Sequence, residues 1–291
     1  MTHDAPSPTE QTPMVRLAAV GDLHLTTGHA GRFRPALLRL RHHADVLLLA
    51  GDLTEHGTAD QAYCLAAEVR DLGLPVIAVL GNHDHLTGRA AATVAAALTD
   101  AGVHLLDETG TVLTVDGVRL GVAGAMGFGG GFDPGRTDKR ADRFAAALAG
   151  LDCDIRVALT HYAPTVATLA GEPRNLYPVL GNAALGTAID AAATHLAVHG
   201  HAHRGCEHGT TPAGVPVRNV AYPLIRCEAR VYHLHLDPDH NVRVAAVGHD
   251  RVGAWMRWGS HRSADLAART IHRAHATRTA GTRTGRGGRR G

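Results

Sequence analysis

Five short motifs rich in Asp, His and Gly recur along the chain, and each follows an apolar run that predicts a buried strand. In chain order they are Gly21-Asp22-Leu23-His24, Gly51-Asp52, Gly81-Asn82-His83-Asp84, His161 and Gly200-His201-Ala202-His203. Ligands of open α/β sheets bind beyond the carboxyl ends of the strands. We therefore expect the five segments to meet at one edge of one sheet. Carboxylate, amide and imidazole donors gathered in one place are typical of a site for a borderline divalent metal.

The spacing within the motifs supports this interpretation. Asp22 and His24 are two residues apart, as are His201 and His203, and alternate residues of an extended segment point the same way. Taken alone, Asp22 fits a helix cap as well as a metal ligand. Asp52 ends a strongly apolar run, where an unpaired carboxylate is costly. Its two oxygens are able to bridge two cations.

Strands and helices alternate in the first third of the chain, which predicts parallel strands with right-handed crossovers. The later strands have an antiparallel pattern, so we expect a mixed sheet or two packed sheets, with irregular structure from residue 162 to residue 182. Asp116-Gly117 predicts a hairpin turn. The expected strands cover residues 15–20, 46–50, 76–80, 111–115, 118–122, 155–159, 195–198, 215–220, 230–236 and 242–247, and the expected helices cover 33–43, 58–71, 88–101, 138–149 and 183–193.

Composition divides the chain into three parts. Residues 1–13 are expected to form a flexible lead and residues 14–253 a folded domain. Residues 254–291 form a tail that holds nine Arg and one Asp but few large apolar residues. Such a tail cannot build a core of its own, so we expect it to be disordered. It is either simply solvated or a binding segment for nucleic acid or another polyanion.

Cysteine content and hydropathy suggest a compartment. The four cysteines form no C-x-x-C pair and no disulfide framework, which favours a reducing environment. The N-terminal residues lack the apolar core of a secretory signal, and no apolar run approaches the roughly 20 residues of a membrane helix. We expect a soluble cytoplasmic protein without membrane contact, and the sequence leaves its oligomeric state open.

The ordered set Asp-x-His, Gly-Asp, Gly-Asn-His-Asp, His and Gly-His-x-His resembles the calcineurin-like metallophosphoesterase superfamily over roughly residues 15–247. The resemblance implies an α/β fold, a four-layer α/β/β/α sandwich with mixed sheets. It also implies two divalent metal ions, Mn, Fe or Zn, at the strand ends. The implied ligands are Asp22, His24 and His203 for the first metal, Asn82, His161 and His201 for the second, and Asp52 as the bridge.

The resemblance also implies a reaction, the hydrolysis of a phosphoester. A hydroxide that bridges the metals would attack phosphorus, Asn82 would bind the phosphoryl oxygens, and His83 would contact the phosphate and protonate the leaving group. A carboxylate must orient His83, and both Glu55 and Asp84 qualify by position. Arg204 is either a further phosphate contact or a solvated side chain.

Departures from better-known branches narrow the class. The segment Leu53-Thr54-Glu55 after the Gly-Asp motif contains neither the Arg of serine/threonine phosphatases nor the Tyr of purple acid phosphatases. The chain looks more like compact bacterial phosphodiesterases, which include cyclic-nucleotide hydrolases. We therefore predict a phosphodiesterase acting on a small phosphoester. The alternatives are a phosphomonoesterase acting on a nucleotide or small metabolite, a nuclease that uses the basic tail, and a non-catalytic scaffold.

Overall fold

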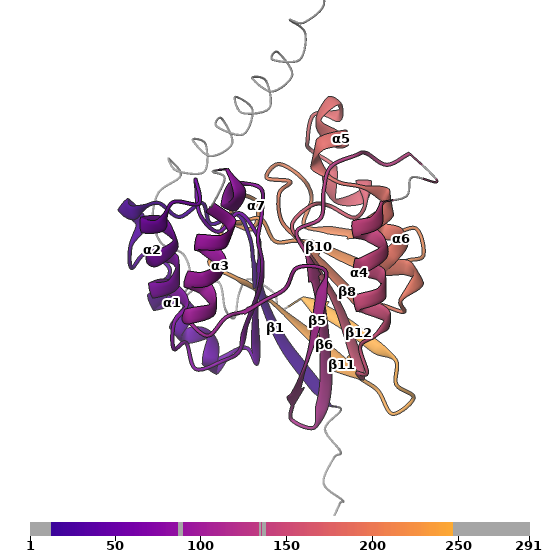
Figure 1. Ribbon diagram of the computed structural model, residues 1–291. Helices are drawn as coiled ribbons and strands as arrows, with labels where there is room; N and C mark the ends of the chain where they lie inside the picture. Colours follow the sequence, from indigo (N-terminus) through magenta and orange to yellow (C-terminus); the bar gives the residue numbers. More distant parts are fainter. Residues whose placement is uncertain (1–12, 87–89, 134, 136–137, 247–291) are drawn as a thin grey trace, which may run out of the picture. The chain divides into compact units, whose positions relative to one another are not determined.

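Two six-stranded β-sheets pack face to face in the computed structural model, and helices cover the outer face of each sheet (Figure 1). The structure describes residues 13–86, 90–133, 135 and 138–246. The predicted four-layer α/β/β/α sandwich is therefore confirmed. The expectations for residues 1–12 and for the tail at 254–291 lie outside the described residues.

Both sheets are mixed, as predicted. The first has the strand order β12-β11-β1-β2-β3-β4 and the second has the order β5-β6-β7-β8-β10-β9. Strand β1 is parallel to β2 and antiparallel to β11, while β6 is parallel to β7 and antiparallel to β5. The strands are β1 Met14–Val20, β2 Val46–Ala50, β3 Val76–Val79, β4 His104–Leu105, β5 Thr109–Val115, β6 Val118–Ala125, β7 Ile155–Thr160, β8 Leu196–His199, β9 His208–Thr210, β10 Pro216–Asn219, β11 Arg230–Leu236 and β12 Val242–Ala246.

Helices α1, α2 and α3 lie against the first sheet, and α4 and α6 lie against the second (Figure 1). The α-helices are α1 Arg34–Arg39, α2 Ala59–Val69, α3 Ala90–Asp100, α4 Lys139–Ala149, α5 Tyr177–Leu180, α6 Ala183–Ala191 and α7 Tyr222–Ile225. Short 3-10 helices are η1 Thr27–His29, η2 Leu40–His42, η3 His83–His85, η4 Val166–Leu169 and η5 Arg174–Leu176. Side chains cap several N-termini, as Thr58 does for α2 and Asn182 does for α6. Among the described residues, no helix has both the length and the apolar character needed to cross a bilayer.

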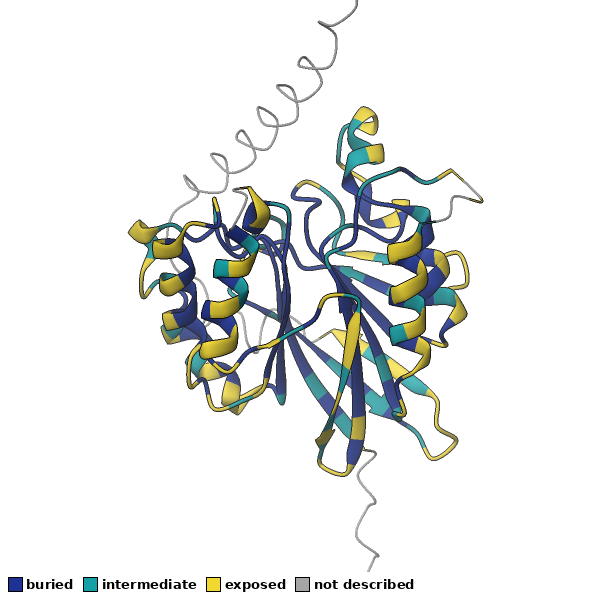
Figure 2. Ribbon diagram, viewed as in Figure 1, coloured by how far each residue is buried: buried dark blue, intermediate teal, exposed yellow. Residues whose placement is uncertain are grey.

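Apolar side chains fill the space between the sheets and beneath the helices. All five residues of β2 are buried, as expected for a central strand covered on both faces. The helices turn their buried faces toward the sheets and their exposed faces outward (Figure 2). Leu, Val and Ala predominate, and Phe33, Phe144 and Tyr232 are the largest fully buried side chains. This packing holds the strand ends rigidly in place.

The structure corrects the expectation that all five motifs meet at the edge of one sheet, while it confirms the alternative of two packed sheets. Strands β1, β2 and β3, which precede the first three motifs, belong to the first sheet, whereas β7 and β8 belong to the second. An apolar run shows that a strand is buried but not which sheet it joins, because strand pairing is a long-range property. The stretch expected to be irregular also contains η4, η5 and α5, and the short strands β4 and β9 were not anticipated.

Candidate metal centre

The five motifs meet where the carboxyl ends of the two sheets come together. Strands β1, β2 and β3 run parallel, as do β7 and β8, so each set ends on one side. Backbone hydrogen bonds join the loops beyond these ends. The Asp22 amide donates to the Gly51 carbonyl at 2.8 Å, and the Gly200 amide donates to the His161 carbonyl at 3.2 Å. The bond between Asp22 and Gly51 connects two loops of the first sheet. The bond between Gly200 and His161 connects two loops of the second sheet.

Four of the predicted ligands have an unusual backbone conformation. The φ angles are 55° at Asp22, 44° at His24, 49° at Asp52 and 68° at His201. Residues other than Gly rarely adopt this left-handed region, and such residues cluster at functional sites. The conformation turns each chain sharply after its strand and directs the side chain into the centre.

Glycines allow the loops to approach closely. A Cβ on Gly200 would lie 2.2 Å from Asp22 Oδ2, and a Cβ on Gly81 would lie 2.2 Å from Asp52 Oδ1. No side chain fits at such distances. Glycine is therefore required at both positions by contact with a carboxylate on a different loop.

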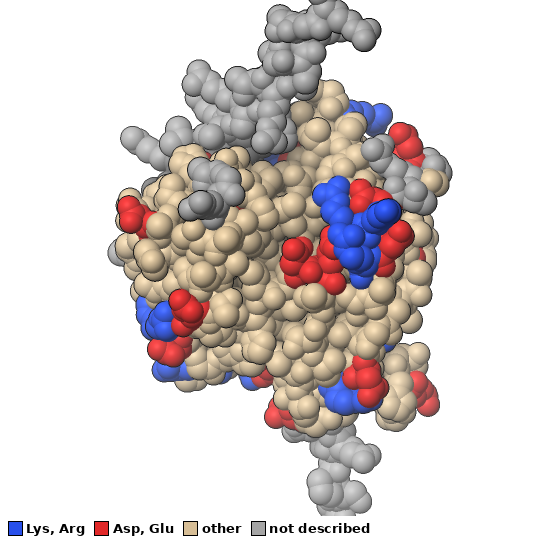
Figure 3. Space-filling view, in the orientation of Figure 1, with Lys and Arg blue, Asp and Glu red and all other residues tan. Residues whose placement is uncertain are grey.

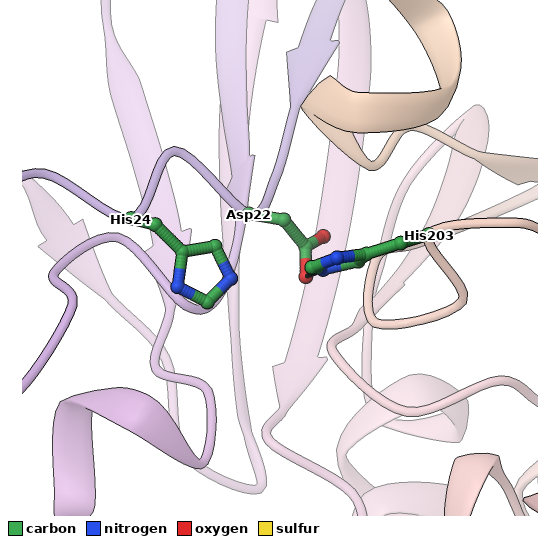
Figure 4. A group of neighbouring side chains, drawn as sticks. All are labelled: Asp22, His24 and His203. Atoms are coloured by element: carbon green, nitrogen blue, oxygen red, sulfur yellow. Dashed lines mark hydrogen bonds and ion pairs between the residues drawn. The ribbon is translucent and has the colours of Figure 1, made fainter. Parts of the chain in front are cut away.

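The first cluster consists of Asp22, His24 and His203, whose side chains point toward one another (Figure 4). All three are buried, and one donor atom from each lies within 4.8 Å of the others. His203 Nε2 is 2.8 Å from Asp22 Oδ1. The structure thus brings together the three residues predicted for one metal.

The second cluster contains Asp52, Asn82, His161 and His201. His161 Nε2 lies 3.3 Å from Asp52 Oδ2 and 3.1 Å from Asn82 Oδ1. The ring centroids of His161 and His201 are 4.7 Å apart. Tyr162, which the sequence analysis did not single out, packs on the His201 ring at a centroid distance of 4.4 Å.

Asp52 connects the two clusters through a single oxygen. Its Oδ1 accepts a hydrogen bond of 2.7 Å from the His83 amide. Its Oδ2 lies 3.8 Å from His24 Nε2 and 3.3 Å from His161 Nε2. Oδ2 therefore faces both clusters, while Oδ1 is engaged by the His83 amide.

Backbone carbonyls determine which ring nitrogen faces the centre. His161 Nδ1 is 2.9 Å from the Ala50 carbonyl, and His201 Nε2 is 3.3 Å from the Val179 carbonyl. A carbonyl only accepts hydrogen bonds, so these nitrogens carry protons, and in the neutral form of each ring the lone pair is on the opposite nitrogen. His161 Nε2 and His201 Nδ1 are thereby prepared as metal donors.

The donor atoms of the centre lack ordinary partners. Among the buried polar atoms of the described residues without a hydrogen bond are His24 Nε2, Asp52 Oδ2 and His201 Nδ1. Burying such atoms is costly unless something replaces water. Each is an imidazole nitrogen or a carboxylate oxygen, the donor types that borderline divalent cations bind. The residues therefore fit two divalent metal ions.

Electrostatics within the centre point the same way. Burial opposes the ionisation of Asp52, but the charge and hydrogen bond of His161 hold the pKa of this carboxyl well below its usual range. Burial also opposes protonation of His161, yet Asp52 outweighs it and raises the His161 pKa to about 9. Burial lowers the His201 pKa to about 3. The Asp52 carboxylate thus favours positive charge beside it.

The two carboxylates considered as partners of His83 have other contacts. The Asp84 carboxylate accepts hydrogen bonds from the Leu53 amide, the Gly81 amide, and the amide and hydroxyl of Thr54. His83 Nδ1 instead lies 2.8 Å from the backbone carbonyl of Glu55. A backbone carbonyl, which no sequence pattern reveals, therefore occupies the position expected for a carboxylate. The Asp84 carboxylate thus joins the loop after β2 to the loop after β3.

Arg204 lies at the periphery. Its side chain is exposed, and its amide donates to the Glu172 carboxylate at 2.7 Å. No contact between its guanidinium and either cluster is found in the described part of the chain, which fits the solvated alternative better than the phosphate contact.

The chain belongs to the calcineurin-like phosphoesterase family, whose family model matches residues 15–205. No curated protein matches it. Solved structures that resemble it include phosphopantetheinyl hydrolase from Mycobacterium tuberculosis, at 17% identity and a TM-score of 0.55, covering 81% of this chain and 96% of that chain. TT1561 of Thermus thermophilus is 16% identical with a TM-score of 0.53, covering 81% of this chain and 100% of that chain. NAD nucleotidase of Haemophilus influenzae is 15% identical with a TM-score of 0.52, covering 91% of this chain and 56% of that chain. These likenesses show the fold.

The contacts of Asp84 predict a structural role. Asp84→Ala would leave several buried donors unpaired and should lower the free energy of unfolding by about 2–4 kcal/mol. Urea denaturation of the metal-free protein measures this change. Asp152→Ala is the matched control, because the Asp152 side chain is 91% exposed and its loss should change little. Equal stability of the two variants would contradict the structural role of Asp84.

The pKa of His161 predicts that metal binding depends on pH. Because that pKa is about 9, a metal at Nε2 must displace a proton under neutral conditions, so acid opposes binding. We expect the Kd for Mn²⁺ to fall about tenfold per pH unit from about pH 7 to about pH 8.5, measured by titration calorimetry. The exposed His43 provides a control, and His43→Gln should keep the same slope. A Kd that does not change with pH would show that His161 is not a ligand.

Proposed function

We propose that the protein is a dinuclear metal-dependent phosphodiesterase. The observation that carries the proposal is the position of Asp52 Oδ2, which faces donor nitrogens of both buried clusters. Asp22, His24 and His203 would hold one divalent ion, and Asn82, His161 and His201 would hold the other. The mixed nitrogen and oxygen donors suit Mn²⁺, Fe²⁺ or Zn²⁺. When bound, such a pair activates water and neutralises charge on a phosphoryl group.

His83 is the proposed general acid. Its side chain is buried, and its ring centroid lies 4.5 Å from that of His24, so it stands directly beside the first cluster. The Glu55 carbonyl keeps a proton on Nδ1. In the imidazolium form, Nε2 carries the second proton, which is the one given to the leaving alkoxide. Afterwards the ring is neutral and still held by the carbonyl.

The charge of the site supports a diester substrate. All the ion pairs that Asp22 and Asp52 form among the described residues are with histidines rather than with Arg or Lys. A phosphomonoester carries up to two negative charges near neutral pH, whereas a diester carries one. With no Arg or Lys paired to Asp22 or Asp52 in the described part of the chain, the side chains beside the metals add no fixed positive charge of this kind. This favours the monoanionic diester, and a cyclic nucleotide is one such substrate.

The alternatives differ in their support. A phosphomonoesterase would use the same metal centre, so only its preference for monoester over diester substrates distinguishes it from a phosphodiesterase. A nuclease would require the basic tail, which lies outside the described residues, so its contact with nucleic acid stays a prediction. On the face shown in Figure 3, acidic and basic side chains lie in mixed groups. Ion pairs on and near α4, Arg143 with Glu108 and Arg140 with Asp138, are of this mixed kind. That mixed distribution does not resemble a phosphate-binding surface.

A cytoplasmic location is also proposed. The four cysteines are all free, with Cys227 buried and the other three partly buried. Thiols remain reduced in the cytoplasm.

Replacement of the shared carboxylate tests the centre. Asp52→Asn should remove metal and activity together, because the neutral amide cannot balance two cations. With Mn²⁺ added, kcat/KM for bis(p-nitrophenyl) phosphate should fall at least about 100-fold, and metal content measured by mass spectrometry should fall below that of the wild type. Asp142→Asn on the exposed face of α4 is the matched control.

The same assay decides between the substrate classes. The wild type should hydrolyse bis(p-nitrophenyl) phosphate or 3′,5′-cyclic AMP faster than p-nitrophenyl phosphate. Exclusive turnover of the monoester would refute the diesterase proposal, and full activity of Asp52→Asn would refute the shared ligand.

Replacement of the general acid should separate chemistry from metal binding. His83→Asn should lower kcat by about 10²–10⁴-fold while two metals stay bound. The loss should shrink for substrates whose leaving group is already a weak base, because these need little protonation. A series of aryl diesters with different leaving-group pKa values measures this dependence. An equal loss across the series would argue against proton donation by His83.

A further inference from the structure

Two loops beyond the first sheet run side by side and bring Glu55 next to the first cluster. The His24 amide donates to the Asp52 carbonyl at 3.0 Å, and the Leu25 amide donates to the Leu53 carbonyl at 3.0 Å. The Glu55 amide then donates to the Leu25 carbonyl at 3.1 Å. This short parallel pairing extends the alignment of β1 and β2 past their ends. Backbone hydrogen bonds therefore fix the position of the Glu55 main chain opposite His24.

The Glu55 carboxylate contacts the outer nitrogen of His24. Its Oε2 lies 3.1 Å from His24 Nδ1, while His24 Nε2 faces Asp52 and the centre. The contact is shielded, since the His24 side chain is 6% exposed and that of Glu55 is 15% exposed. The contact is an ion pair whose angle lies outside hydrogen-bond geometry. A carboxylate at this distance favours the tautomer with the proton on Nδ1 and the lone pair on Nε2.

His24 is distinguished by this partner from the other histidines of the clusters. The outer nitrogens of His161 and His201 face backbone carbonyls. His203 Nδ1, like His24 Nδ1, forms no hydrogen bond among the described residues. Of these four histidines, only His24 has a carboxylate within ion-pair distance of its outer nitrogen in the described part of the chain. A carboxylate raises the basicity of a ligating imidazole more than a neutral carbonyl does, because it carries a full negative charge.

Glu55 does not need its carboxylate to orient His83. The Glu55 backbone carbonyl already contacts His83 Nδ1 at 2.8 Å. Glu55 therefore contacts two histidines through different groups. Its main-chain carbonyl contacts His83, the proposed general acid, and its carboxylate contacts His24, a proposed metal ligand. Substitution of the side chain removes only the second contact.

We infer that Glu55 is a positioning residue for the first metal site: its carboxylate orients His24 and strengthens binding of the ion held by Asp22, His24 and His203. The second site, formed by Asn82, His161 and His201, does not depend on this contact. The inference rests on the dinuclear centre proposed above and assigns Glu55 to one of its two sites.

The test compares the two metal sites in Glu55→Gln and Glu55→Ala. Full-length wild type and variants are stripped with chelator and titrated with Mn²⁺ by calorimetry. We expect one Kd to rise about 10–100-fold while the other changes less than about threefold. Asp60→Asn, an exposed carboxylate five residues further along, is the matched control and should leave both Kd values unchanged.

Electron paramagnetic resonance gives a second readout that does not depend on turnover. At a free Mn²⁺ concentration that fills both wild-type sites, the wild type should show an exchange-coupled pair. The Glu55 variants should show the six-line signal of an isolated ion. If Glu55→Ala fails to fold, as judged by circular dichroism, the isosteric Glu55→Gln decides the result.

The outcomes separate this inference from the proposed function. If the wild type binds two Mn²⁺ ions and the variants keep both Kd values, or lose both equally, the assignment of Glu55 to the first site is overturned and the dinuclear centre stands. If the wild type does not bind two ions, the dinuclear centre itself is overturned, and this inference with it.

Discussion

The buried carboxylate of Asp52 is the constraint on which the rest of the centre depends. It is fully buried at the end of an apolar strand, where an uncompensated charge is costly. One oxygen is compensated by the His83 amide, and the other faces histidines from both sheets. Every neighbouring loop must approach closely to supply this compensation. The close approach of Gly81 to the Asp52 carboxylate follows from that requirement.

Around this carboxylate the main chain does much of the orienting. Carbonyls of Ala50, Val179 and Glu55 hold the outer nitrogens of three histidines. Asp84 in turn holds the loop that carries Glu55, by accepting hydrogen bonds from the Leu53 and Thr54 amides. The rigid sheets therefore set the geometry of the side chains through the backbone. Small shifts of a loop would misalign several donors at once.

The predicted parts of the structure are those with strong local signals. The apolar runs identified the central strands, and the motif residues Asp22, His24 and His203 do form one cluster. The partner of His83 was missed because a backbone carbonyl has no sequence signature. Tyr162 was missed because a single aromatic residue beside a histidine says nothing about the ring of His201, which lies far away in the sequence.

The sequence by itself determined the donor types, their order and the strands that carry them, because hydrophobic periodicity and residue chemistry are local properties. Tertiary structure decided which strands share a sheet, which oxygen of Asp52 faces both clusters, and that the Glu55 carboxylate contacts His24 rather than His83. These features depend on distances between segments that are far apart in the chain or lie on neighbouring loops. Only the packing of the two sheets fixes those distances.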